Sequence, residues 1–288
     1  MDKQIVKTDK KTVKKREKIE YKSYSFVDKL LKKCGMKNEQ KRKRVGGIMS
    51  VSLFAIGITV WVWLALNVCM WIAGGILSIE PIRSTIKNMS NTTLLELVLE
   101  AIIYLAALLV TVFVPWLVLK KKFPSAMTTR NEMGLRGMLT WTDILLAVVG
   151  YIVSTLVGGL LLIVAQAMIP GIDWQASQEV GFRTISSSQD MIMAFVALAI
   201  VAPICEELIF RGWLYGKLRA KIPAFPAILL VSLLFGLVHG QWNVGLVVFC
   251  MSVANCLIRE LTGTIYGGVV VHIIRNMIAF YGLFILGL

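Results

Sequence analysis

The side chains of this sequence that could do chemistry are few, and they lie in apolar surroundings. Its only two histidines, His239 and His272, fall in separate apolar stretches, and two adjacent glutamates, Glu206 and Glu207, fall in a third. An ionisable side chain at membrane depth costs about 3 kcal/mol to insert, so such residues are rare there and usually face a protein interior where they carry function. We therefore expect the function to depend on these residues.

The two adjacent glutamates differ in the partners that a helix would give them. Glu207 and Arg211 are four residues apart, so on a helix they share one face, in the order that favours an ion pair. Glu206 is rotated from Glu207 by about 100° and has no such partner. A carboxylate without a partner in an apolar site binds a proton more readily, which suits it to take one from water. The spacing favours Glu206 as a general base and the other two residues as a structural pair.

Each histidine has a notable neighbour four residues away. Phe235 and His239 form one such pair, and His272 and Asn276 form the other. A buried histidine is often only a satisfied core residue, and a buried asparagine often only links two helices. The combination of an acid, two imidazoles and a carboxamide in three separate apolar stretches nevertheless favours a common site.

Membrane-spanning helices are needed to position these residues. Of the 288 residues 57% are hydrophobic, which is more than soluble globular proteins contain. About 20 apolar residues span a bilayer as a helix. Runs of this kind predict an all-α, polytopic transmembrane helical bundle of about seven spans, with the candidate residues in the C-terminal four. The spans are approximately 48–77, 97–119, 143–169, 190–215, 226–239, 244–261 and 264–286.

The formal net charge of +14 is concentrated at the N-terminus. Residues 1–45 hold 17 of the 31 Lys and Arg residues and 6 of the 17 Asp and Glu residues. A polybasic segment beside a span usually anchors a cytoplasmic flank, so we expect anionic lipid of the bilayer, and not nucleic acid, as its partner. Residues 24–34 place apolar side chains at helical spacing and predict a short interfacial helix.

Loop charge predicts the orientation. Lys and Arg gather in the loops after the second and fourth spans and are scarce in the alternate loops, which predicts a multi-pass cell-membrane protein with a cytoplasmic N-terminus. The loops 78–93 and 170–189 read as extracytoplasmic turns. The chain thus divides into a basic tail (1–45), N-terminal spans and loops (46–189) and a core that holds the candidate residues (190–288). The five cysteines lack paired metal spacing, and four of them lie in apolar stretches, so small buried residues are expected.

The candidate residues carry a family resemblance. The sequence resembles the CAAX protease and bacteriocin-processing (CPBP) family of intramembrane endopeptidases, related to CAAX prenyl protease type 2. Its motifs are Glu-Glu-x-x-x-Arg, Phe-x-x-x-His and His-x-x-x-Asn, in that order. They match here as Glu206-Glu207 with Arg211, Phe235 with His239, and His272 with Asn276. The resemblance covers about residues 190–280; the first three spans are not diagnostic.

The resemblance implies a hydrolase with assigned roles. Glu206 is expected to be the general base and His239 its partner in activating water, while His272 and Asn276 donate to the tetrahedral oxygen, as an oxyanion hole requires. Glu207, Arg211 and Phe235 are expected to support the site.

Zinc is the alternative to this metal-free mechanism. Glu206, His239 and His272 are the two-histidine, one-carboxylate set that catalytic zinc uses, but the His-Glu-x-x-His signature is absent. We expect no cofactor, because the resemblance to the prenyl-protein members favours water activated by glutamate alone.

A peptide or membrane-protein precursor is the expected substrate. The alternative is a non-catalytic scaffold or bacteriocin-immunity protein, or a proton-coupled transporter that uses Glu206 as its relay, because intramembrane carboxylates also serve transport.

Overall fold

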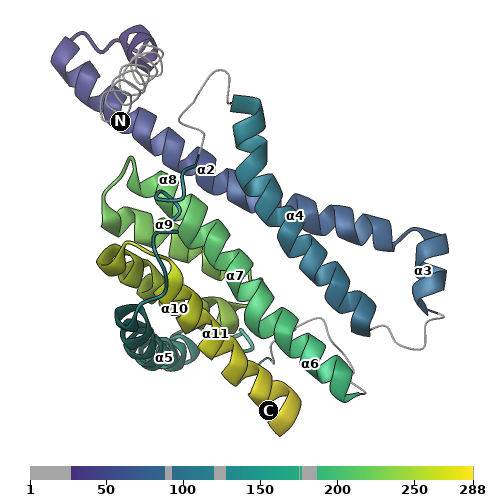
Figure 1. The fold of residues 1–288 in the computed structure, drawn as a ribbon. Coiled ribbons are helices and arrows are strands. Elements are labelled where there is room, and N and C mark those ends of the chain that lie inside the picture. Colours follow the sequence, from purple (N-terminus) through teal and green to yellow (C-terminus); the bar gives the residue numbers. More distant parts are fainter. Residues whose placement is uncertain (1–26, 88–92, 120–127, 175, 177–186, 288) are drawn as a thin grey trace, which may run out of the picture. The chain divides into compact units, whose positions relative to one another are not determined.

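The computed structural model describes residues 27–87, 93–119, 128–174, 176 and 187–287, and every regular element among them is helical (Figure 1). The expected all-α bundle is confirmed. The chain separates into two compact units, one of residues 1–58 with 115–127 and one of residues 59–114 with 128–288. The helices α2 (Glu39–Leu77) and α4 (Thr93–Leu119) contribute residues to both units.

The first unit contains a short helical segment at residues 27–33 and the first part of α2. Val27 and Leu31 are buried on one side of that segment. Arg42 of α2 pairs with Asp28, with Nε 3.1 Å from Oδ1, and donates from Nη1 to two carbonyls of the intervening turn. The segment therefore overlaps the interfacial helix expected at 24–34, of which 24–26 lie outside the described residues.

The second unit holds the remaining helices and all of the candidate site residues. Its elements are α3 (Glu80–Lys87), α5 (Trp141–Met168), α6 (Ser188–Val196), α7 (Ala202–Glu207), α8 (Tyr215–Arg219), α9 (Ala224–Leu237), α10 (Trp242–Thr262) and α11 (Tyr266–Tyr281), with π-helical segments Ala197–Val201 (η2), Leu208–Leu214 (η3) and Gly282–Leu286 (η4). The expectation of a turn over residues 78–93 was wrong at its centre, because α3 forms there with Glu80 in its first turn.

Five helical stretches among the described residues are long and apolar enough to cross a membrane. They are Glu39–Leu77, Trp141–Met168, Ser188–Arg219, Trp242–Thr262 and Tyr266–Leu286. Two shorter apolar stretches, Ala101–Pro115 and Ala224–Leu237, coincide with the second and fifth expected spans. The apolar runs of the sequence thus locate seven apolar helical stretches among the described residues. Of the two shorter ones, Ala101–Pro115 belongs to α4, which is 27 residues long, whereas α9, with 14 residues, is shorter than a typical span.

Helix α10 is the centre of the second unit and packs against α5, α9 and α11 (Figure 1). Its approach to α9 depends on two glycines. A Cβ added at Gly236 would lie 2.7 Å from the Gly245 carbonyl oxygen, and one added at Gly245 would lie 2.8 Å from the Gly236 carbonyl oxygen. Neither position therefore accepts a larger residue unless the backbones move apart.

A group of hydrogen-bonded polar residues, Thr140, Asp143 and Thr264, holds the start of α5 beside the turn between α10 and α11. Thr140 and Asp143 form a capping box at the α5 N-terminus. The other Asp143 oxygen, Oδ1, accepts a hydrogen bond of 3.0 Å from the Thr264 hydroxyl in that turn. Gly263 ends α10 in the left-handed conformation, with φ 73°, which favours glycine. These hydrogen bonds fix where α11, the helix that contains His272, begins.

Candidate active site

Glu207 is the centre of a fully buried polar cluster. Its side chain has no exposure, and its Oε1 lies 2.9 Å from Arg211 Nη1 and 3.1 Å from His272 Nδ1. Asn255 of α10 donates to the same oxygen at 3.0 Å and also to the Gly268 carbonyl at 3.2 Å. One carboxylate therefore joins α7, α10 and α11. The expected pairing of Glu207 with Arg211 is present.

Glu206 points to a different surrounding, as the helical rotation predicts. Its side chain is 16% exposed, and its Oε2 lies 3.6 Å from His272 Nε2. Tyr104 of α4 donates its hydroxyl to Glu206 Oε1 at 3.0 Å. His272 consequently lies between the two carboxylates, with Nδ1 toward Glu207 and Nε2 toward Glu206. The more accessible acid is the one that the spacing favours as a base.

Phe235 packs against both histidines. Its ring lies edge-on to His239, with centroids 5.0 Å apart, and edge-on to His272, with centroids 5.7 Å apart. The Arg211 guanidinium stacks on the same ring, and its central carbon, Cζ, lies 4.3 Å from the Phe235 ring centroid. Phe235 is fully buried, so it acts as a fixed wall that positions all three side chains.

The orientation of His239 is set by the backbone. Its Nδ1 lies 2.7 Å from the carbonyl oxygen of Phe235, which can only accept, so Nδ1 donates. In the neutral imidazole the proton is then on Nδ1, and Nε2 is left as an acceptor. His239 makes no direct hydrogen bond to Glu206 among the described residues, although the charge of Glu206 acts on it. Its Nε2 is thus free to accept a hydrogen from water.

Asn276 is held by an irregularity in the third long helical stretch. Its Nδ2 donates to the Leu198 carbonyl at 2.8 Å. That carbonyl is available because Ala202, its α-helical partner, donates to Ala197 in the π-helical segment η2, and Pro203, its π-helical partner, has no N–H. The π-helical segment and the proline therefore create the acceptor that orients Asn276, and the second hydrogen of Nδ2 remains for another partner.

The structure brings most of the predicted residues together and adds two that sequence reasoning missed. Glu206, Glu207, Arg211, Phe235 and His272 form one cluster, and His239 joins it through Phe235. Asn276 lies one helical turn after His272, and it contacts η2. The missed residues are Asn255 and Tyr104. A polar side chain inside an expected apolar span was the available signal for Asn255, whereas Asn276 was singled out by its four-residue spacing from His272.

Glu206, His239 and His272 are the ligand set of the alternative zinc mechanism. Among the residues that the structure describes, no three His, Cys, Asp or Glu side chains form a group that would hold a metal ion. The cysteines do not add to the site: Cys69, Cys205, Cys250 and Cys256 are buried and free, as expected, and Cys34 is exposed. The metal-free mechanism stays a prediction.

Comparisons with known proteins match the part of the chain that holds this cluster. Residues 188–278 match the family model described as "Type II CAAX prenyl endopeptidase Rce1-like". The "Putative membrane peptidase YdiL" of Bacillus subtilis (strain 168) is 31% identical over 88 residues, which cover 31% of this chain and 36% of that protein. The chain thus spans about a third of the length of this relative. No solved structure matches the chain. The candidate residues from Glu206 to Asn276 lie inside the matched segment, and Tyr104 lies outside it.

Proposed function

We propose that this chain is an intramembrane endopeptidase of the Rce1-like family that hydrolyses a peptide bond with water activated by Glu206; the match of residues 188–278 and the likeness to a putative membrane peptidase support this. The observation that carries the proposal is the unequal pair of carboxylates on either side of His272. Glu207 is fully buried and bound by Arg211, Asn255 and His272. The Glu206 side chain, in contrast, is partly exposed. A buried site with one free acid beside two imidazoles suits general-base hydrolysis.

The first step assigns water to Glu206 and His239. Glu206 takes a proton from a water molecule while its oxygen attacks the carbonyl carbon of the scissile bond. His239 Nε2 accepts a hydrogen bond from the remaining O–H of that water and orients it, because Nδ1 donates to the Phe235 carbonyl. The Tyr104 hydroxyl donates to Glu206 Oε1, which directs the other oxygen, Oε2, toward the reacting water.

The second step assigns the negative oxygen of the tetrahedral intermediate to His272 and Asn276. Asn276 has one Nδ2 hydrogen left after its bond to Leu198. His272 can donate from Nε2 when it carries protons on both nitrogens, because Nδ1 already faces Glu207. Glu206 then returns its proton to the leaving amine, so a new carboxyl and a new amino terminus form and the base is restored. Preorganised donors of this kind are usually a large part of rate acceleration.

The test is a comparison of peptides by mass spectrometry. Membrane and secreted peptides are compared from cells that carry the intact protein, the Glu206→Gln variant or the Glu260→Gln variant. Glu260 is the matched control, because it pairs with Arg219 and Tyr215 outside the cluster. We expect new termini with the intact protein and the control and none with Glu206→Gln. The same termini in all three samples would contradict the proposal, and no termini in any would favour the scaffold or the transporter.

The substrate, the anionic lipid partner and the cytoplasmic N-terminus also belong to the proposal. A peptide or membrane-protein precursor fits a site at membrane depth. The basic residues of 1–45 fit an anionic lipid surface, and the asymmetry of the loops fits a cytoplasmic N-terminus.

A further inference from the structure

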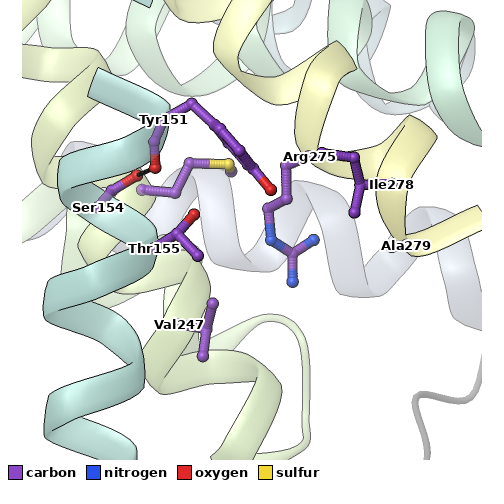
Figure 2. Close-up of a pocket in the computed structure, with 8 residues that line it drawn as sticks. Tyr151, Ser154, Thr155, Val247, Arg275, Ile278 and Ala279 are labelled. Carbon is purple, nitrogen blue, oxygen red and sulfur yellow. Dashed lines mark hydrogen bonds between the residues drawn. The ribbon is translucent and has the colours of Figure 1, made fainter. Parts of the chain in front are cut away.

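A second polar site lies beside the catalytic cluster, in a cavity of about 170 Å³ between α5, α10 and α11 (Figure 2). Its polar lining comes from Tyr151, Ser154 and Thr155 of α5 and from Arg275 of α11, and Val247 and Met251 of α10 form part of the apolar wall. Figure 2 shows the Tyr151 hydroxyl and the Arg275 guanidinium directed into the same space. None of these residues has a role in the proposed hydrolysis.

Arg275 is a cation without a carboxylate partner in the described part of the chain. Its one hydrogen bond there runs from Nη1 to Asn276 Oδ1, at 3.3 Å. The charge of Glu206 acts on it, but the two groups form no ion pair. Ser154 donates its own proton to the Tyr151 carbonyl at 3.1 Å, so it adds no free donor. The cavity therefore presents a guanidinium and a phenol hydroxyl with unused donor capacity, at a depth where an uncompensated charge is costly.

The depth of Arg275 limits what can occupy the cavity. Arg275 stands near the middle of the stretch Tyr266–Leu286, roughly 14 Å from one end and 17 Å from the other at 1.5 Å per residue. Ser154 stands near the middle of α5 in the same way. Lipid phosphates lie in the interfacial layer outside the hydrocarbon core, not at its centre. An anion at this position is therefore more readily supplied by a molecule that enters the active site.

We propose that this cavity binds a carboxylate of the peptide substrate, held by the Arg275 guanidinium and the Tyr151 hydroxyl. The inference rests on the proposed function and names a substrate group that the catalytic cluster does not recognise. A guanidinium has the planar, paired donors that match a carboxylate, and desolvation strengthens that pair. The carboxylate comes either from the peptide C-terminus or from an Asp or Glu side chain.

The position of the cavity links recognition to catalysis. Arg275 and Asn276 are adjacent and hydrogen-bonded, and Asn276 is the proposed donor to the intermediate. A carboxylate bound at Arg275 would therefore fix how far the scissile carbonyl lies from the anionic end of the substrate. The protein is expected to select peptides by the spacing between the cut and a carboxylate.

The test uses a peptide that the mass-spectrometric comparison identifies as a substrate, in three forms. The forms carry a free C-terminus, a C-terminal amide, and amides in place of the acidic side chains. KM and kcat are measured for each form with purified protein in phosphatidylcholine vesicles. For the intact protein we expect one of the two neutral forms to raise KM at least about tenfold, because a charge-assisted bond is lost. Whichever form does so identifies the source of the carboxylate.

Variants decide whether the cavity is responsible. In Arg275→Gln the difference in KM between the acid and amide forms should disappear. Tyr151→Phe should reduce the difference, and Tyr281→Phe, an exposed tyrosine on the same helix, should leave it as in the intact protein. A tenfold difference in KM that persists in Arg275→Gln would overturn the inference. An equal loss of cleavage for all peptide forms in Arg275→Gln would also overturn it, because it would indicate that Arg275 serves as a counter-ion for Glu206. A preference that appears only in phosphatidylglycerol vesicles would also overturn it and indicate a lipid site. If the inference fails in one of these ways but cleavage of the amide form still requires Glu206, the proposed hydrolysis is not contradicted.

Discussion

Adjacent glutamates with opposite roles provide the sharpest prediction. Glu206→Gln and Glu207→Gln are the same chemical change at neighbouring positions. We expect the first to abolish cleavage with little loss of stability, and the second to cost much of the stability of the fold. The two outcomes follow from one geometric difference, the 16% exposure of Glu206 against the complete burial of Glu207.

The magnitude for Glu207 follows from the charge that it leaves behind. Arg211 is fully buried and has only Glu207 as an ion-pair partner among the described residues. Removing one partner of a buried pair costs about 3–5 kcal/mol, because the remaining charge stays uncompensated. Glu206 forms no hydrogen bond to His272 at 3.6 Å, and a glutamine can still accept from Tyr104. Its replacement should change the free energy of unfolding by less than about 1 kcal/mol.

Denaturation of the two purified variants in detergent micelles measures the free energy of unfolding, and peptide cleavage is followed in parallel. A double variant, Glu207→Met with Arg211→Met, removes both charges and keeps the volume. It should recover much of the loss, since apolar replacements of buried pairs are often tolerated. Equal destabilisation by Glu206→Gln and Glu207→Gln would refute the reasoning, because it would mean that both acids are structural.

Three other predictions concern the newly found partner, the topology and the metal. Asn255→Ala should destabilise the fold by about 2 kcal/mol in the same denaturation assay, because Glu207 loses one donor and the Gly268 carbonyl loses its own; Ser252→Ala, on the same helix, serves as the control. A membrane-impermeant thiol reagent should label Cys34, the exposed cysteine, in inverted vesicles and not in intact cells, and the opposite result would place the N-terminus outside. Cleavage should persist after treatment with a zinc chelator, and a loss that zinc restores would favour the metal mechanism.

The spans were predictable because burial in lipid leaves a strong trace in sequence. Apolar runs located α5, α10 and α11 to within a few residues, and the four-residue spacing located the Glu207–Arg211 pair. Helix α3 was not predicted, because a segment of eight residues rich in polar side chains resembles a loop when it contains no long apolar run.

Contacts between distant segments left a weaker trace. Asn255 reaches Glu207 only because α10 packs between α5, α9 and α11, and a single polar residue in a span does not say which helix it faces. Tyr104 gave no signal at all, since a tyrosine is common in an apolar helix and its hydroxyl partner lies 102 positions away. The acceptor of Asn276, the Leu198 carbonyl, was equally unpredictable. Pro203 indicates that a backbone N–H is missing, but it does not indicate which carbonyl is left without a partner.

Gly268 explains why the buried cluster can form. A Cβ added there would lie 3.0 Å from Glu207 Oε2 and 3.2 Å from Asn255 Cβ, so a larger residue would push these side chains a few tenths of an ångström from their present positions. His272 follows Gly268 by four residues and therefore lies on the same face of α11, one turn further along. The absence of one side chain thus brings the imidazole to the carboxylates. A glycine is usually counted as a packing residue, but here the close packing and the chemistry depend on the same helix approach.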